Sequence, residues 1–188
     1  MAESTAAAAA AAAGQDSTLL IRSAEPADHE AIRGIMLGAY AQYAGLLAPD
    51  VFSRYLAGQL DLGTHASYGR LLVAGTQEGV RGFAAFYPDA SVQGSGFASS
   101  WARVRALAVH PGASWPGVAR ILLAACERLA AEAGAPVLAI RSASFMTDAI
   151  ASYARLGYRR APEFDGTTPV RSVAHLRYVA QMYLKLRR

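Results

Sequence analysis

Residues 99–120, SSWARVRALAVHPGASWPGVAR, decide how the rest of the chain is arranged. The segment predicts a buried strand over 99–109, a break at the sequence VHP, a loop of small residues and a long helix that begins at Pro116. Gly117 and Ala119 place no bulky side chain over the first turn of that helix. Unpaired backbone N–H groups and the positive end of the helix dipole coincide there, which favours an anion. This turn is therefore predicted to hold the pyrophosphate of an acyl-carrying nucleotide.

The length and the charge of the chain limit the classes of protein to which it can belong. The chain has 188 residues, of which 53% are hydrophobic and 17% charged, enough for one domain with a sizeable core. The net charge of +4 comes from 18 basic and 14 acidic residues. Nearly all the basic residues are arginines, and they are scattered along the chain without forming a tract. The basic balance suits an anionic ligand, but the scatter makes nucleic-acid binding a weak hypothesis.

Cysteine usage and apolar runs indicate the compartment. Cys126 is the only cysteine, and its place on the apolar face of the helix from Pro116 predicts a buried core thiol. No apolar run approaches the length of a membrane span, so we expect a cytoplasmic protein without membrane association. The alanine-rich segment 1–17 lacks the basic residues of a secretory signal, and we expect a disordered tail there. A single domain is predicted over 18–188.

Apolar periodicity and turn signals predict the remaining elements in chain order. Before the 99–120 segment we expect a strand over 19–24, helices from Pro26 and over 49–60, a polar loop over 61–69, and a hairpin of strands 70–74 and 80–87. After it we expect a parallel strand over 135–142, a helix capped by Thr147 or Asp148 that ends at Arg155, and strands over 158–164 and 176–186. The predicted class is α/β, with a mixed, mostly antiparallel twisted sheet and helices on both faces.

Three segments resemble the GNAT superfamily of acyl-CoA-dependent N-acetyltransferases. LAVHPGASWPGVARILL (107–123) is similar to the family's signature, in which a strand ends in a V-x-P turn and a Q/R-x-x-G-x-G/A loop opens a long helix. SYARLGYRR (152–160) is similar to the family's F-Y-x-R/K-L-G-F segment, and LLIRSAEPADHEAI (19–32) resembles the family's opening strand and helix. The resemblance covers about residues 18–188. It implies a GNAT-like domain that uses acetyl-CoA as co-substrate and needs no metal.

The resemblance also implies roles for matching positions. The backbone of Leu107, Ala108 and Val109 would pair with the pantetheine arm, and an N–H there would hold the thioester carbonyl oxygen as charge builds up on it. Tyr153 matches the family's tyrosine near the thioester sulfur, which can protonate the departing thiolate. Backbone donors to the pyrophosphate would come from Trp115, Gly117, Val118, Ala119 and Arg120. The expected reaction is direct attack of a primary amine, from a small molecule or a peptide, on the thioester.

Three positions depart from the family's pattern. Ser114 stands at the Q/R position of the loop, where it would hydrogen-bond the phosphate or the start of the helix. Pro116 has no N–H to offer, and Met146 replaces an asparagine found in many members. Each loss would weaken cofactor affinity by ~1 kcal/mol. These departures motivate a second hypothesis, a non-catalytic acyl-CoA-binding or regulatory module.

The sequence gives less information about the pocket that binds the acceptor amine and about the general base. We expect an acceptor pocket between the first two helices, the 88–98 loop and the last hairpin, lined by Tyr40, Tyr43, Phe52, Tyr87 and Tyr183. Some family members use a glutamate on the strand over 99–109 as general base, but Arg103 occupies about that position here. Glu25, Asp61, His65, Glu163 and a relay through water remain alternatives. A homodimer through the last strand or the alanine-rich helix is also left open.

Overall fold

A seven-stranded mixed sheet forms the centre of the computed structural model, which describes residues 19–113, 115–167 and 170–179. Its strand order is β1-β2-β3-β4-β5-β7-β6, and every neighbouring pair is antiparallel except β4 and β5. The strands are β1 (Leu20–Ser23), β2 (Arg70–Thr76), β3 (Gly79–Tyr87), β4 (Ala102–Val109), β5 (Val137–Ala143), β6 (Arg159–Arg160) and β7 (Ser172–Tyr178). The predicted α/β class, with its mostly antiparallel sheet, is confirmed.

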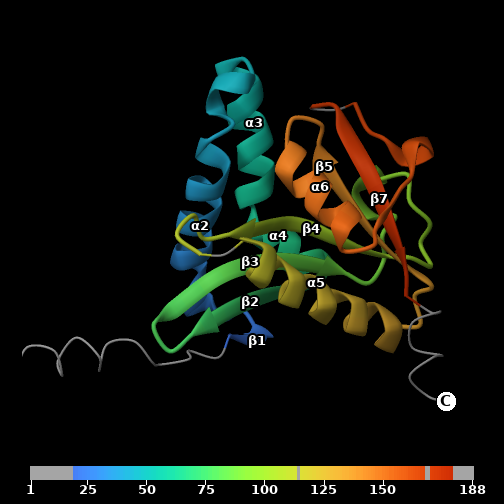
Figure 1. Cartoon of the computed structure of the whole chain (residues 1–188), viewed down its shortest axis with the longest axis horizontal. Coiled ribbons are helices and arrows are strands. Elements are labelled where there is room, and N and C mark those ends of the chain that lie inside the picture. Colours follow the sequence, from blue (N-terminus) through green and yellow to red (C-terminus); the bar gives the residue numbers. More distant parts are fainter. Residues whose placement is uncertain (1–18, 114, 168–169, 180–188) are drawn as a thin grey trace, which may run out of the picture.

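Helices cover both faces of this sheet, as predicted (Figure 1). On one face, α2 (His29–Ala41), α3 (Pro49–Leu60) and α4 (Leu62–Tyr68) enclose a core with strand side chains such as Phe83. On the other face, α5 (Trp115–Glu132) packs its apolar side against the sheet, and α6 (Thr147–Arg155) joins the same core. Cys126 of α5 is fully buried, and burial raises the pKa of its thiol. The prediction of a core thiol is confirmed.

Strands β4 and β5 separate partway along their length. They pair in parallel only from Ala102–Leu138 to Val104–Ile140, after which β5 continues with β7 alone. The register between β3 and β4 shifts at the same level, and Ala106 adopts a φ of 55°, which is uncommon for a residue with a Cβ. This is the geometry of a β-bulge, which bends the strand and re-aims its side chains. In Figure 1, β7 accordingly runs steeply past the flatter strands β2 and β3.

Segment 61–69 is a helix and not the expected loop. Its N-terminus is capped by Asp61, whose carboxylate accepts hydrogen bonds from the backbone N–H of Thr64 at 3.0 Å and from the Thr64 hydroxyl at 2.6 Å. The resulting helix α4 buries Leu62 and His65 against the sheet. A capping side chain and two buried residues stabilise this short helix despite its polar composition.

The C-terminal elements also differ from the prediction. The strand expected over 158–164 shortens to β6, and a 3₁₀ turn over Pro162–Phe164 follows, because proline has no N–H for a strand ladder. Strand β7 begins four residues before the predicted start at 176, and the predicted continuation beyond 179 lies outside the described residues. Helix α6 has Met146 as its N-cap and no side-chain cap, so the predicted capping by Thr147 or Asp148 is wrong.

The N-terminal helix begins later than expected. Pro26–Asp28 form a 3₁₀ turn, and α2 follows from His29. The alanine-rich segment 1–17 lies outside the described residues. Among the helices of the described part of the chain, none combines the length and hydropathy needed to cross a bilayer.

Candidate functional site

A cavity of about 770 Å³ lies where β4 and β5 separate. Leu107, Ala108 and Val109 of β4 form part of its wall, and the β4–α5 turn continues it through Ala113. Because β4 has no strand partner on the β5 side beyond Val104, the wall includes an open strand edge. An extended chain that carries amide groups can pair with such an edge. The structure therefore places the three predicted pantetheine positions where such pairing is geometrically available.

The turn between β4 and α5 is held by its own hydrogen bonds. The backbone N–H of His110 donates to Arg81 O at 2.8 Å, and that of Ala113 donates to His110 O at 2.8 Å. The His110 ring also stabilises the turn, because its Nδ1 accepts a hydrogen bond from the Gly112 N–H at 3.0 Å. On the α2 side, a Cβ on Gly38 would lie 3.0 Å from Pro111 Cγ, so helix and turn are in close contact. These contacts fix the approach to the first turn of α5.

The first turn of α5 follows directly on the cavity wall at Ala113, and its residues 117–120 are absent from the described lining. Val118 and Ala119 are buried in the core against the sheet, Gly117 is half-buried and Arg120 is exposed. Apolar anchoring on one side leaves the turn's backbone available to an anion, and the pyrophosphate cradle stays a prediction. Trp115 begins α5, and Ser114 lies outside the described residues.

Tyr153 of α6 also lines the cavity. Its side chain is 3% exposed and its ring contacts those of Tyr158 and His175. Burial raises the pKa of the Tyr153 hydroxyl to about 12, although a side-chain hydrogen bond with Ser142 acts in the opposite direction. The phenol is therefore protonated at neutral pH and is a proton donor at the wall of the cavity.

An aromatic cluster forms the wall next to α2 and α3. Tyr40 and Tyr43 line the cavity, and Tyr55 of α3 joins them with a ring centroid 5.9 Å from that of Tyr40. The Tyr55 hydroxyl lies 3.9 Å from Sδ of Met146, which also lines the cavity. Met146 therefore offers a thioether sulfur as a weak acceptor for the Tyr55 hydroxyl. Tyr55 was missed as a site residue, although its place on the apolar face of its helix pointed inward.

Other predicted acceptor residues lie elsewhere. Tyr87 is fully buried behind the wall, because its hydroxyl lies 2.6 Å from Nδ1 of His65 and its ring packs near Tyr68 of α4. Phe52 packs among the helices, the 88–98 loop supplies no lining residue, and Tyr183 lies outside the described residues. The assignment of Tyr87 to the substrate pocket is thus corrected: α4, which the sequence did not predict, covers it.

None of the side chains considered as a general base lines the cavity. Glu25 and the exposed Glu163 lie at 3₁₀ turns, and Asp61 caps α4. His65 uses both ring nitrogens, since its Nε2 lies 3.0 Å from Gln59 O, and burial lowers its pKa. Within the described ranges, Asp148 is the one carboxylate that lines the cavity.

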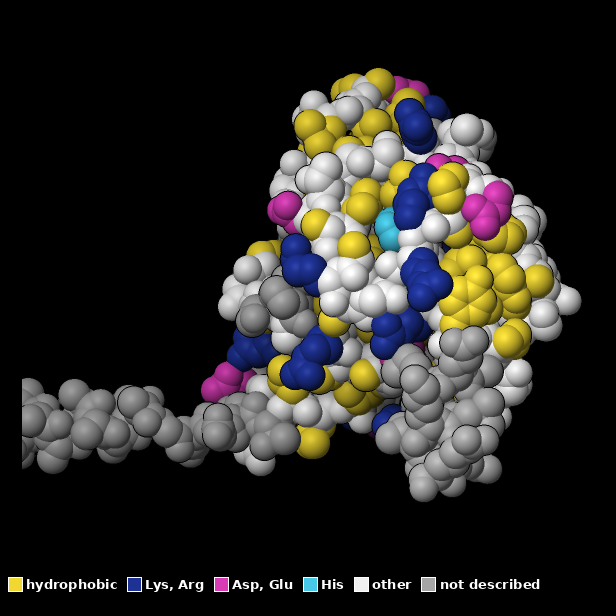
Figure 2. Space-filling model, turned by 45° about the vertical axis from the view of Figure 1, so that its right-hand side comes forward, with side chains coloured by type: hydrophobic (Ala, Val, Ile, Leu, Met, Phe, Trp, Pro, Cys, Tyr) yellow, Lys and Arg dark blue, Asp and Glu magenta, His cyan; other side chains and the backbone are white. Residues whose placement is uncertain are grey.

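The abundance of arginine at the cavity is the feature that sequence reasoning missed. Its lining includes Arg54, Arg103, Arg105, Arg141 and Arg155. The alternation of a strand gave a signal, since two arginines two positions apart in β4 must share a face. On the surface shown in Figure 2, basic side chains are instead spread among neutral and apolar ones without forming a continuous stripe. Among the described residues, no group of three or more side chains is suited to hold a metal ion.

Comparison with known proteins gives a family and a fold. The family model for acetyltransferase (GNAT) matches residues 40–158, well over half of the chain. PaiA N-acetyltransferase from Thermoplasma acidophilum, solved with coenzyme A, is similar with a TM-score of 0.68 and 13% identity, over 86% of this chain and 99% of that one. YncA from Salmonella typhimurium, solved with its cofactor acetyl-CoA, is similar with a TM-score of 0.58 and 19% identity, over 86% and 94%. At these identities the likeness shows the fold. No curated protein matches the sequence significantly.

Proposed function

The chain belongs to the acetyltransferase (GNAT) family, and on this premise we propose that it transfers the acetyl group of acetyl-CoA to a primary amine by direct attack. One observation carries the proposal. The open edge of β4 and the hydroxyl-bearing Tyr153 of α6 face a single cavity where β4 and β5 separate. A thioester held along that edge would have a proton donor among the residues that line the same cavity. The acceptor is the amine of a small molecule or a peptide.

The described residues suit acetyl-CoA in two places. The backbone of Leu107, Ala108 and Val109 offers an open edge to the pantetheine amides, and the first turn of α5 offers backbone N–H groups to the pyrophosphate. Acetyl-CoA supplies an activated thioester. The bulge at Ala106 re-aims the backbone there, so that an N–H of this strand can stabilise charge on the thioester oxygen during attack.

Tyr153 is assigned as the general acid. Its pKa of about 12 keeps the phenol protonated at neutral pH, so it can donate a hydrogen bond to the departing sulfur. When the phenol passes this proton to sulfur, water returns a proton to the phenol oxygen in the same step, so that no buried phenolate accumulates. The buried position of the ring, packed on Tyr158 and His175, holds the hydroxyl in place during this step.

Removal of the ammonium proton is assigned to water. Asp148 is the one lining carboxylate among the described residues, and the family's glutamate position carries Arg103. Positive charges beside an amine lower its pKa, because they disfavour the ammonium form. Arg103, Arg105 and Arg141 therefore raise the fraction of neutral amine in the cavity, which reduces the need for a strong base.

Calorimetric titration with acetyl-CoA, free CoA and NAD tests the proposal first. NAD is the matched control because it shares the pyrophosphate and lacks pantetheine. We expect micromolar binding of acetyl-CoA and CoA and none of NAD, followed by amine-dependent release of CoA. Absence of acetyl-CoA binding would overturn the proposal. Binding without transfer to any primary amine would instead support the non-catalytic acyl-CoA module.

A further inference from the structure

Arg103, Arg105 and Arg141 form one cluster at the wall of the cavity, called here the arginine cluster. Arg103 and Arg105 share a face of β4 because side chains alternate along a strand. Arg103 pairs in register with Ala139 of β5, so the same register sets Arg105 level with Arg141, where the two strands begin to separate. The electrostatic data agree, since Arg105 acts on the pKa of both other arginines and lowers each.

Arg103 is a buried cation that pairs with no carboxylate of the described part of the chain. Its side chain is 3% exposed, and its guanidinium lies over the ring of Tyr87 at 5.1 Å from the centroid. Its hydrogen bonds are long, at 3.4 Å to Val92 O and 3.5 Å to Gln93 Oε1, and its Nε has no partner. Burial, together with Arg105 and Arg141, lowers its pKa to about 10. The charge is therefore poorly compensated.

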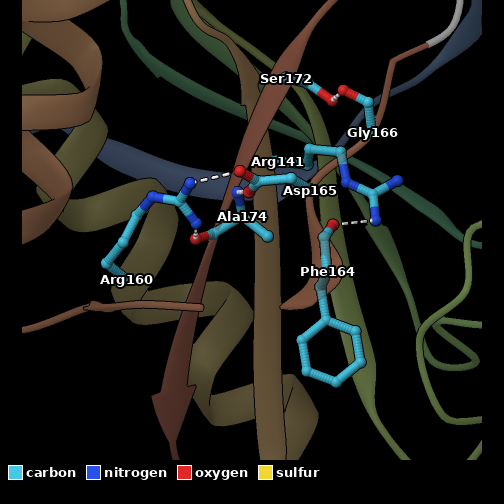
Figure 3. Close-up of polar contacts among 7 residues, drawn as sticks. All are labelled: Arg141, Arg160, Phe164, Asp165, Gly166, Ser172 and Ala174. Carbon is cyan, nitrogen blue, oxygen red and sulfur yellow. Dashed lines mark hydrogen bonds and ion pairs between the residues drawn. The ribbon is translucent and has the colours of Figure 1, made fainter. Parts of the chain in front are cut away.

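Among the described residues, the hydrogen bonds of Arg141 go to backbone oxygens, and Figure 3 shows the one to Phe164. One terminal nitrogen donates to Phe164 O at 2.5 Å and to Ser95 O at 2.9 Å, and the guanidinium lies over the ring of Phe97. The nearby Asp165 is directed elsewhere, because its carboxylate accepts from Arg160 and from the backbone N–H of Ala174. These bonds hold Arg141 in place and leave its Nε without a partner.

Arg105 is the member that is most available to a ligand. Among the described residues its guanidinium has no ion pair and no hydrogen bond, and its Nε is buried. Arg105 lines the same cavity as Tyr40 and Tyr55, and its positive charge partly offsets the burial that raises the pKa of both tyrosines. A half-buried guanidinium that faces a cavity without a counterion is suited to bind an oxyanion.

We propose that the arginine cluster binds a carboxylate or phosphonate group on the acceptor, so that the substrate is an anionic primary amine. This inference rests on the proposed function and specifies its substrate class. Three like charges with no ion pair between them and any described acidic residue disfavour the folded state, and a bound anion removes that disadvantage. An acceptor anchored in this way also keeps its amine close to the cations that favour its neutral form.

The phosphates of CoA are the alternative ligand for the arginine cluster, but their predicted site lies elsewhere. Val104 packs in the core on the α5 side of the sheet, so its neighbours Arg103 and Arg105 face the opposite side, toward α2–α4. The predicted pyrophosphate site is the first turn of α5. The arginine cluster and this turn therefore belong to opposite faces of the sheet.

The test compares acceptors that differ only in charge. L-phenylalanine and L-methionine are each paired with the corresponding primary amide, and 2-aminoethylphosphonate is paired with ethanolamine to separate phosphonate from carboxylate recognition. CoA release is measured for wild type, Arg105→Gln, Arg105→Lys and Arg128→Gln. Arg128 of α5 is the matched control, because it is an exposed arginine paired with Glu132. Affinity for acetyl-CoA is measured on every variant.

We expect at least a tenfold higher kcat/KM for one anionic acceptor than for its neutral partner. Arg105→Gln removes this preference through KM, Arg105→Lys retains part of it, and Arg128→Gln leaves it intact. Affinity for acetyl-CoA stays within twofold of wild type in all variants. Equal use of charged and neutral acceptors would overturn the inference while leaving acetyl transfer established. A loss of acetyl-CoA affinity in Arg105→Gln with unchanged acceptor preference would also overturn it, and would assign the cluster to the cofactor.

A second readout covers the case in which acetyl-CoA binds but no tested amine is acetylated. The melting temperature is measured with succinate, or with inorganic phosphate, at saturating CoA so that the nucleotide site is filled. Stabilisation of wild type but not of Arg105→Gln supports an anion site at the cluster. Equal shifts in both proteins, or none in either, overturn it. Failure of acetyl-CoA to bind at all is the separate result that defeats the proposed function.

Discussion

A Cβ atom on Gly82 would stand 2.5 Å from Cγ1 of Val118, so β3 and the first turn of α5 meet where a side chain has no room. The same Cβ would lie 3.1 Å from Cδ1 of Leu122 and 3.3 Å from Ala108 O. Residue 82 pairs with Val109 in the sheet, so this contact sets the start of α5 against the end of β4. The two parts of the predicted acetyl-CoA site are thus positioned through a single glycine.

Gly82→Ala should both destabilise the protein and weaken the binding of acetyl-CoA. Valine is stiff at χ1, so α5 must shift, and we expect a loss of about 1–3 kcal/mol in the free energy of unfolding. Urea unfolding and calorimetry measure the two effects. Gly34→Ala is the control, because a Cβ there meets nothing within 4 Å in the middle of α2 and should stabilise by about 1 kcal/mol. Unchanged stability and affinity in Gly82→Ala would contradict the close packing.

Tyr153→Phe should slow turnover about 100-fold and leave the affinity for acetyl-CoA nearly unchanged. The ring keeps its packing while the proton donor is lost. Because the pKa of the hydroxyl is about 12 and a general acid must be protonated, the wild-type rate should show no loss from this group below about pH 10. Tyr158→Phe is the control, since Tyr158 is buried beside Tyr153 but does not line the cavity. A full rate at saturating substrates in Tyr153→Phe would show that the acid is another group.

Arg105→Met should raise stability. The change removes one of three like charges in the arginine cluster and keeps a long apolar side chain, so we expect a gain of about 1 kcal/mol, or roughly 2–4 °C in Tm. Residues that are selected for binding often lower the stability of the folded protein in this way. Thermal unfolding without ligand measures the effect, and Arg128→Met on the α5 surface should stay within about 0.5 kcal/mol of wild type. A lower Tm in Arg105→Met would mean that Arg105 has a stabilising contact.

The Arg22–Asp28 pair should make unfolding sensitive to acid. The Arg22 guanidinium hydrogen-bonds both carboxylate oxygens of Asp28, which accepts a further bond from the Glu25 N–H at 2.8 Å. The hydrogen bond from Arg22 is the main cause that lowers the pKa of Asp28 from 3.8 to about 2. A lowered folded-state pKa stabilises above about pH 4, and this contribution is lost as the pH falls from 4 toward 2. Urea unfolding at pH 6 and at pH 2.5 should therefore show a larger decrease for wild type than for Asp28→Asn. Equal decreases would show that another group governs acid unfolding.

Local signals in the sequence predicted most of the elements. Pro116 and Gly157 mark helix boundaries, and the hairpin turn and the parallel strand after α5 follow from spacing. Helix α4 was missed because its polar composition outweighed the capping signal of Asp61 and Thr64. The end of the β6 segment was missed because the effect of Pro162 on a strand ladder was not weighed.

By itself, the sequence determined the strand, turn and helix within 99–120, although β4 begins at Ala102 and not at 99, and it placed Tyr153 on the helix that is α6. These depend on periodicity and spacing, which act over a few residues. The acceptor-side roles of Tyr40 and Tyr43 stay predictions. Only the tertiary structure decided that Tyr87 lies behind α4, that Tyr55 joins the wall, and that Arg141 stands level with Arg105. Those relationships depend on strand register and on helices packed across the sheet, and such contacts join residues far apart in the chain.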